Sequence, residues 1–325
     1  MSQILSGLSA ILVGVGGAIV LYWALNKGVE QLPAKWEERL KPYVFIGPAF
    51  ALLGTLLVWP AIRTIWLSFY GPGADSFVGL DNYVQLGTDP RLRMSIINTA
   101  LWILIVPAIS VIVGLIVAVL ADRLKSVWES VTKSVIFMPM AVAMVSAGTI
   151  WMFVYAWRPE GADQIGVLNA IWTTFGGEPQ TWLRLSTGRL NSFLLMVILI
   201  WMQAGFAMVL LSAAIKNVPE DTLEAARVDG ATEPQIFFRV VVPQIAATIM
   251  VVLTTVTIFV LKIFDVVFVT TGGQFGTEVV AVTFFRELVQ FRNSGQAAAV
   301  VVAMLIATIP VMIYNVRQYR AQEAT

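Results

Sequence analysis

Long uninterrupted apolar stretches dominate the pattern of this chain. Seven runs without a charged residue are long enough to cross the hydrocarbon core of a bilayer, which takes about 20 helical residues. They are residues 2–26, 42–62, 94–121, 134–157, 190–215, 240–261 and 293–316. A lipid-exposed backbone must satisfy its own hydrogen bonds, so each run is predicted to be a helix. The pattern therefore predicts an all-α fold, a polytopic membrane bundle of seven transmembrane helices.

The first run differs from a signal peptide, because no basic residues precede it and its apolar part is longer than usual. We therefore expect a retained helix there. Orientation follows from the basic residues. With the N-terminus outside, the inner segments contain twelve Lys and Arg residues and the longer outer segments seven. The positive-inside rule thus favours an N-terminus outside and a C-terminus in the cytoplasm.

Composition narrows the classes of function. Hydrophobic residues make up 58% of the chain, charged residues 13%, and the mean hydropathy is +0.80, which places the chain in a bilayer. The chain has no His and no Cys, so disulfides, imidazole or thiolate metal sites and imidazole-dependent triads are excluded. A net charge of +1 gives no signal for nucleic-acid binding. We expect neither a metal site nor an enzyme.

One polar segment, residues 217–243, interrupts the apolar pattern on the predicted cytoplasmic side. Pro219 suits the first turn of a helix, and Gly230 suits a left-handed C-terminal cap. Thr232 and Gln235 form a capping-box pattern for a second helix, and Pro243 marks the start of the next span. The pattern predicts a short helix, a tight turn and another short helix.

The first of these helices presents small residues beside charge. Ala225 and Ala226 leave the backbone approachable, while Glu224 and Arg227 are spaced for an i, i+3 ion pair. Such a face suits docking into a groove of another protein. An amphipathic loop lying on the membrane surface explains the same pattern equally well.

The outer loops are the other polar regions. Residues 157–189 include an apolar stretch, 164–177, that is too short to span and suits an interfacial helix. Residues 266–294 contain a TTGG turn at 270–273. These loops either receive a partner or simply cover the helix ends.

Several motifs resemble the permease subunits of bacterial ABC importers, in the carbohydrate-uptake branch with the maltose and glycerol-phosphate permeases. The polar segment resembles the EAA motif through Glu224, Ala225, Ala226 and Gly230. The other matching stretches are FVGLDNYVQL at 77–86, NTALW at 98–102, GVLN at 166–169 and FDVVFVTTGG at 264–273. The match runs from about residue 43 to the C-terminus. It divides the chain into an N-terminal helix and linker, residues 1–42, and a six-helix permease domain, residues 43–325.

This resemblance implies a set of partners and a place in the inner (cytoplasmic) membrane. The family forms a pore from two similar permeases, above two cytoplasmic ATP-binding subunits and below an extracytoplasmic sugar-binding protein. ATP and Mg²⁺ then bind to the ATPase subunits, and this chain, which has no G-x-x-x-x-G-K-[ST] sequence, binds no cofactor. In the family the EAA helix docks in the ATPase. Carried over, Glu224, Ala225, Ala226, Asp229 and Gly230 are the predicted ATPase-coupling residues.

Polar and aromatic groups within the spans are the candidates for the translocation pathway. Trp201, Gln203 and Phe206 combine ring faces with an amide, as sugar binding requires, and their places relative to the EAA motif resemble the sugar site of maltose-type permeases. Phe259 is a further candidate. Lys262 and Asp265 have the i, i+3 spacing of an ion pair and could face the translocation cavity between the helices. Helix packing, or snorkelling of the charged pair, remains the alternative.

The leading interpretation is a sugar permease of an ABC importer, for a disaccharide, oligosaccharide or glycoside. An ion-coupled secondary transporter of a small polar solute is the alternative, although it should show internal repeats and carboxylate ion sites. An intramembrane protease is disfavoured, because the chain lacks His and the spans lack a carboxylate pair.

Overall fold

The computed structural model describes residues 2–159 and 161–323, which are helical apart from loops and an isolated β-bridge between Tyr70 and Phe77. The all-α prediction is therefore confirmed for these residues. The chain separates into two compact units, Met1–Trp66 and Leu67–Thr325. The boundary predicted at residues 42 and 43 lies within a helix of the first unit and stays a prediction.

The first unit is a helical hairpin. Helix α1 (Ser2–Glu30) packs on α2 (Ala34–Leu53), and the rings of Tyr22 and Phe45 stack with centroids 6.2 Å apart. A π-helical turn, Gly54–Val58, joins α2 to α3 (Trp59–Leu67). Together they form one apolar helix, Ala34–Leu67, none of whose residues is buried within this unit. Such a hydrophobic surface suits lipid or packing against further helices.

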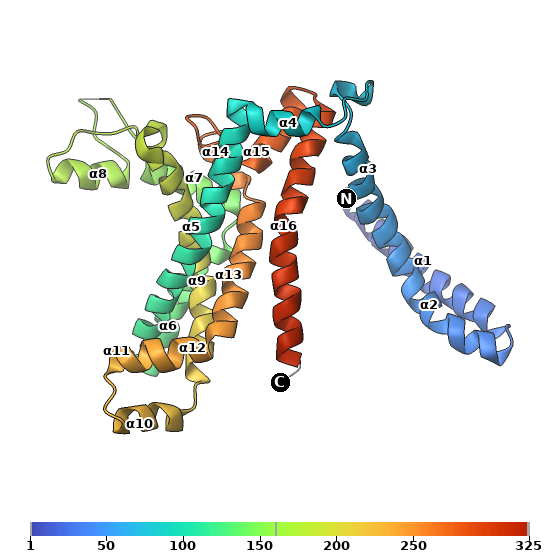
Figure 1. The fold of residues 1–325 in the computed structure, drawn as a ribbon, viewed down its shortest axis with the longest axis horizontal. Helices are drawn as coiled ribbons and strands as arrows, with labels where there is room; N and C mark the ends of the chain where they lie inside the picture. The colour runs from blue at the N-terminus through green and yellow to red at the C-terminus, as the bar shows by residue number, and fades with distance from the viewer. Residues whose placement is uncertain (1, 160, 324–325) are drawn as a thin grey trace. The chain divides into compact units, whose positions relative to one another are not determined.

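The second unit is a bundle around two long helices, α5 (Pro90–Ala121) and α9 (Leu190–Lys216). Figure 1 shows α10 and α11 at one end of this bundle and α4, α14 and α15 at the other. The remaining helices are α4 (Asp81–Thr88), α6 (Ser126–Phe137), α7 (Met144–Val154), α8 (Val167–Thr174), α10 (Glu220–Val228), α11 (Glu233–Ile236), α12 (Val242–Gln244), α13 (Ala246–Leu261), α14 (Asp265–Thr270), α15 (Val280–Phe285) and α16 (Ser294–Glu323).

Helix α9 approaches both α5 and α6 closely because a glycine lies at each contact. A Cβ on Gly114 would lie 2.5 Å from the Cβ of Ala207 and 2.8 Å from the amide nitrogen of Met208. A Cβ on Gly205 would lie 2.4 Å from the carbonyl oxygen of Ile136 on α6. Small residues allow this approach, and dispersion contacts between the helices then stabilise the bundle, since lipid offers no hydrophobic drive.

Replacing Gly114 by Ala is expected to lower the thermal unfolding midpoint of the purified chain in detergent, because overpacking typically costs about 1–3 kcal/mol. The matched control is Gly87→Ala, in helix α4, where an added Cβ meets no atom within 4 Å. This control should leave the midpoint unchanged or raise it slightly. Equal midpoints for the two variants would show that α5 and α9 are not packed through Gly114.

Two of the predicted straight spans are broken, so the count of seven is not confirmed. The span predicted at 134–157 divides between α6 and α7, whose axes differ by 104°. Pro139 lies in the 3-10 turn Met138–Ala141 between them, and Val142 is extended. The span predicted at 240–261 bends by 68° at Ile245, whose ψ is 6°. Hydropathy missed both breaks because apolar composition continues across them.

By length and composition, three helical segments of the described chain can cross a membrane: Ala34–Leu67, Pro90–Ala121 and Thr187–Lys216. The number rises to five if each bent pair is one span. The apolar part of α16, Ser294–Pro310, is shorter. The protein is thus a multi-helix membrane bundle, and seven spans stay a prediction.

Candidate coupling segment and translocation pathway

Helix α10 follows α9 after a short link and is set by local capping. Pro219 is its N-cap residue, and Glu220 and Asp221 occupy the first turn, where carboxylates oppose the positive end of the helix dipole. This agrees with the predicted short helix, except that Pro219 precedes the first helical residue instead of occupying it.

The turn after α10 is a Schellman motif, as the glycine in the sequence indicated. Gly230 has a φ of +80°, and its N–H donates to the carbonyl of Arg227 at 3.0 Å. The Ala231 N–H donates to the carbonyl of Ala226 at 3.1 Å. A Cβ on Gly230 would meet no atom within 4 Å, so only the backbone conformation demands glycine there.

Of the predicted coupling residues in α10 and the turn after it, only Ala226 is half-buried, on the same side as Leu223. Leu223 and Ala226 are half-buried and pack against the main hydrophobic core. Glu224, Ala225, Asp229 and Gly230 are exposed. Val228, which the sequence reasoning did not select, is 87% exposed. Leu223 and Ala226 therefore anchor the helix, and the others are accessible to a partner.

The ion pair expected between Glu224 and Arg227 is not the one that forms. The Nε of Arg227 donates to the Oε1 of Glu233 at 3.0 Å, across the turn. This hydrogen bond raises the pKa of Arg227. Glu224 retains an exposed carboxylate, because the turn brings Glu233 of the second helix to Arg227. Both members of the new pair are exposed, so it contributes little to stability.

The second helix of the segment is longer than the four α-helical residues of α11. It continues through a π-helical turn, Phe237–Val241, and α12 up to the bend at Ile245. The expected capping box is present between Thr232 and Gln235, and in it the Thr232 N–H donates to Oε1 of Gln235 at 2.8 Å. Pro243 lies two residues before the bend. A cavity of about 370 Å³ lies between this helix, α10 and the end of α5.

A network of charged side chains ties the end of α9 to α5 and α6 beside this segment. Lys133 Nζ lies 2.6 Å from Oδ1 of Asp122 and 2.5 Å from Oε1 of Glu129. The hydroxyl of Ser212 donates to Asp122 at 2.7 Å, and Lys216 pairs with Glu129. Helix α10 therefore joins the bundle where three helices are linked by ion pairs.

The predicted pathway residues of α9 have different environments. Trp201 is half-buried and meets Trp151 of α7 edge-on, with ring centroids 5.8 Å apart. Phe206 is also half-buried. Gln203 is only 3% exposed, and its Oε1 has no hydrogen-bond partner. The three side chains therefore do not form one exposed surface on the isolated chain.

The candidates after α9 lie around a helix break. Phe259 is 40% exposed near the end of α13, and Lys262 is exposed directly after it. Asp265 begins α14. The expected ion pair between Lys262 and Asp265 does not occur among the contacts of the described chain, because α13 ends at Leu261 and the i, i+3 geometry of one helix is lost.

Three asparagines that the sequence reasoning did not select organise the loops at the opposite end. Each lies inside a motif used for the family resemblance, and each buried carboxamide donates to two backbone carbonyls. The pairs of acceptors are Ser68 and Tyr70 for Asn82, Gly276 and Glu278 for Asn98, and Ala156 and Gln180 for Asn169. The family motifs were the sequence signal that could have identified these asparagines. In the structure their side chains hold loops of the same chain in place. A helix, α8 (Val167–Thr174), occupies the stretch 164–177, and its position at a membrane interface stays a prediction.

A second charged cluster lies at that end. Arg91 of α5 pairs with Glu287 and, at 3.2 Å, with Glu278. Arg286 also pairs with Glu278 and donates to the carbonyl of Gly272 at 2.6 Å. Glu278 and Glu287 are buried, with 5% and 4% of their surface exposed. Sequence reasoning missed this cluster because its members are almost 200 positions apart.

No metal centre emerges from the part of the chain that the structure describes, since no three His, Cys, Asp or Glu side chains gather there. The features above consist of an exposed helical segment, its ion-paired base and a set of aromatic side chains.

Comparisons with known proteins agree with this arrangement. Residues 110–322 match the family described as "Binding-protein-dependent transport system inner membrane component". The alpha-glucoside transport system permease protein AglF of Rhizobium meliloti is 43% identical, over 98% of this chain and 97% of that protein. The osmoprotective compounds uptake permease protein GgtC of Synechocystis is 47% identical, over 86% of this chain and 99% of that protein.

The fold is also similar to a solved structure. A chain of a bacterial ABC transporter involved in the import of the acidic polysaccharide alginate superposes with a TM-score of 0.73 at 20% identity, covering 87% of this chain and 98% of that chain. Its likeness concerns the fold alone.

These matches decide between the two classes of transporter that the sequence left open. A permease of this family carries no ATPase domain, and no cofactor is expected on it. The chain belongs to the binding-protein-dependent transport system inner membrane components and is the multi-pass permease subunit of an ABC importer.

Proposed function

We propose that this permease imports a sugar, in the form of a disaccharide, an oligosaccharide or a glycoside. The observation that carries the proposal is the 43% identity to a permease named for alpha-glucosides, which extends over 98% of the chain. The aromatic side chains along α9 and α13 are consistent with it, because sugars stack their apolar faces on rings.

The importer would be assembled from this chain, a second similar permease, two cytoplasmic ATP-binding subunits and an extracytoplasmic sugar-binding protein. The apolar helix Ala34–Leu67 supports a second permease as partner, because none of its residues is buried within its own unit. The excess of basic residues in alternate loops supports an N-terminus outside and the coupling segment in the cytoplasm.

Residues 217–243 would transmit ATP-driven closure of the ATPase dimer to the bundle. Glu224, Ala225, Asp229 and Gly230 are exposed for contact, while Ala226 rests against the core. Ion pairs behind the segment link α5, α6 and α9, so a displacement of α10 would move these helices together. The segment thus acts as a lever between inward-facing and outward-facing states.

The solute would pass between the two permeases, so pathway side chains should be at least partly exposed on a single chain. Trp201, Phe206, Phe259 and Lys262 meet this condition, as does Asp265. Gln203 does not, since it is buried in α9; we retain it as a candidate because its amide oxygen is unpartnered.

Phe259→Ala is expected to reduce the efficiency of uptake about fivefold, because an aromatic contact contributes about 1 kcal/mol. Ile258→Ala is the matched control, since Ile258 is the adjacent residue of α13 and is likewise 40% exposed. Initial uptake rates in vesicles would compare them at several solute concentrations. Equal losses in both variants would assign Phe259 to packing.

A second candidate solute class comes from the 47% identity to a permease named for osmoprotective compounds. The deciding experiment reconstitutes the whole importer and measures ATP hydrolysis and uptake with alpha-glucosides, oligosaccharides and osmoprotective compounds in turn. Stimulation by an alpha-glucoside or oligosaccharide, dependent on the binding protein, is the expected result. Stimulation by osmoprotective compounds alone would replace the sugar assignment, and uptake by this chain without partners would overturn the importer.

A further inference from the structure

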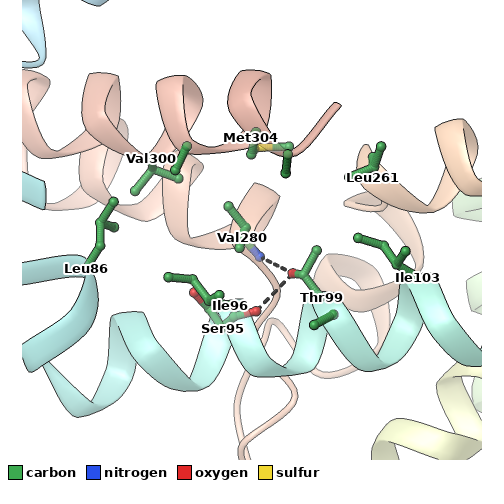
Figure 2. A pocket seen from close by; sticks show the side chains of 12 residues that line it. Leu86, Ser95, Ile96, Thr99, Ile103, Leu261, Val280, Val300 and Met304 are labelled. Carbon is green, nitrogen blue, oxygen red and sulfur yellow. Dashed lines mark hydrogen bonds between the residues drawn. The ribbon is translucent and has the colours of Figure 1, made fainter. Parts of the chain in front are cut away.

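A lateral apolar groove runs between α5 and α16 of the second unit. Its first part is a cavity of about 170 Å³, and Figure 2 shows side chains of several helices around it. The apolar lining includes Ile96, Ile103, Leu261, Val300 and Met304. A second cavity, of about 480 Å³, continues from Ile103 to Pro310.

The polar atoms at the groove are already satisfied within the chain. The hydroxyl of Ser95 donates to the carbonyl of Leu92 at 2.8 Å, and that of Thr99 donates to the carbonyl of Ser95 at 2.9 Å. The Val280 N–H donates to the Thr99 hydroxyl at 3.0 Å, as Figure 2 shows. The hydroxyls of the first cavity therefore bond within the chain, and its otherwise apolar lining favours a hydrocarbon occupant.

The length of the groove fits one leaflet of a bilayer. Between Val300 and Pro310 the helix α16 rises about 15 Å, at 1.5 Å per residue. Half of a hydrocarbon core about 30 Å thick is the same length. An acyl chain running along the groove would therefore be covered from near the membrane surface to the midplane.

Arg93 precedes the groove-lining residues of α5 by one helical turn. Arg93 is one turn before Ile96 on α5, and Ile96, Ala100 and Ile103 follow at the i, i+3 and i+4 spacing of one helix face. Arg91, two positions earlier, is held by Glu278 and Glu287. Arg93 is exposed, and no acidic side chain of the described residues pairs with it. Its guanidinium is therefore available for an anionic headgroup.

We propose that this groove is a binding site for an anionic phospholipid. Arg93 binds the phosphate headgroup, and one acyl chain lies along Ile96, Ala100 and Ile103 of α5, against Val300 and Met304 of α16. Charge and hydrocarbon recognition occur one helical turn apart, which matches the boundary between headgroup and acyl chain.

The test is to titrate the purified importer and the isolated full-length chain with dioleoyl phosphatidylglycerol and dioleoyl phosphatidylcholine, and to count bound lipids by native mass spectrometry. The unmodified protein should bind phosphatidylglycerol about fivefold more tightly, as expected for one arginine near an anionic headgroup. Arg93→Gln should abolish that preference. Ala100→Phe, or Ile103→Phe if the first variant misfolds, should reduce binding of both lipids.

Two controls match these variants in kind. Lys125→Gln removes an exposed cation at the other end of the bundle, and Ile112→Phe adds bulk on an exposed part of α5 outside the groove. Both should bind lipid as the unmodified protein does. Unchanged binding in Arg93→Gln and in the pocket-filling variants would overturn the site. Binding by the isolated chain but not by the importer would also overturn it, because a partner helix would then occupy the groove.

Discussion

Replacing Gly230 by Val is expected to abolish ATP-driven uptake while the chain still inserts into the membrane. Gly230 has a φ of +80° in the Schellman turn, a conformation that a β-branched residue adopts only with strain. No neighbouring atom would clash with its Cβ, so the change acts through the backbone. Relieving the strain unwinds the end of α10 and displaces Glu224 and Ala225 from the surface offered to the ATPase.

Uptake and ATP hydrolysis of the reconstituted importer would be measured together, with membrane content determined by immunoblot. The matched control is Gly176→Val, because Gly176 has a φ of +83° and equally open surroundings in the loop after α8. That variant bears the same strain away from the coupling segment and should transport. Normal uptake by Gly230→Val would contradict the proposed lever.

Of the single substitutions proposed for this chain, Arg91→Leu should cause the largest loss of folding stability. Glu287 is 4% exposed, and Arg91 is its ion-pair partner among the described residues. Removing the cation leaves a buried carboxylate uncompensated, which typically costs about 3–5 kcal/mol. Glu278 also loses one of its two arginines but keeps Arg286.

The yield of folded protein and the thermal midpoint in detergent would measure this loss. The double variant Arg91→Leu with Glu287→Leu should recover much of it, because both members of the pair are then apolar. Lys125→Leu, at an exposed position, should have little effect. A double variant no more stable than Arg91→Leu would show that the pair is not the cause.

Local chemistry made a large part of this molecule predictable. Apolar runs longer than the bilayer core identified helical segments, since a backbone in lipid must bond within its own helix. Gly230 identified the Schellman turn, because the left-handed conformation is a property of one residue and its neighbours. The short helix predicted after Pro219 followed from the same caps, and the structure gives it as α10, Glu220–Val228.

Local chemistry did not predict where helices bend or which side chains pair. The bends at Pro139 and Ile245 lie within apolar sequence, so hydropathy does not register them. Arg227 pairs with Glu233, although Glu224 is closer in sequence, because the turn brings the second helix back to the first. Lys262 and Asp265 were separated by a helix end that their i, i+3 spacing did not reveal.

The sequence by itself determined that this is an all-helical membrane protein with a capped polar segment, because periodicity, length and caps act over a few residues. The tertiary structure alone decided which of these features face outward. It buried Gln203 while leaving Phe259 exposed, and it brought Arg91 to Glu287 across almost 200 positions. It also opened the groove below Arg93 between α5 and α16. Burial and long-range pairing depend on how helices pack, and this information is distributed over the whole chain.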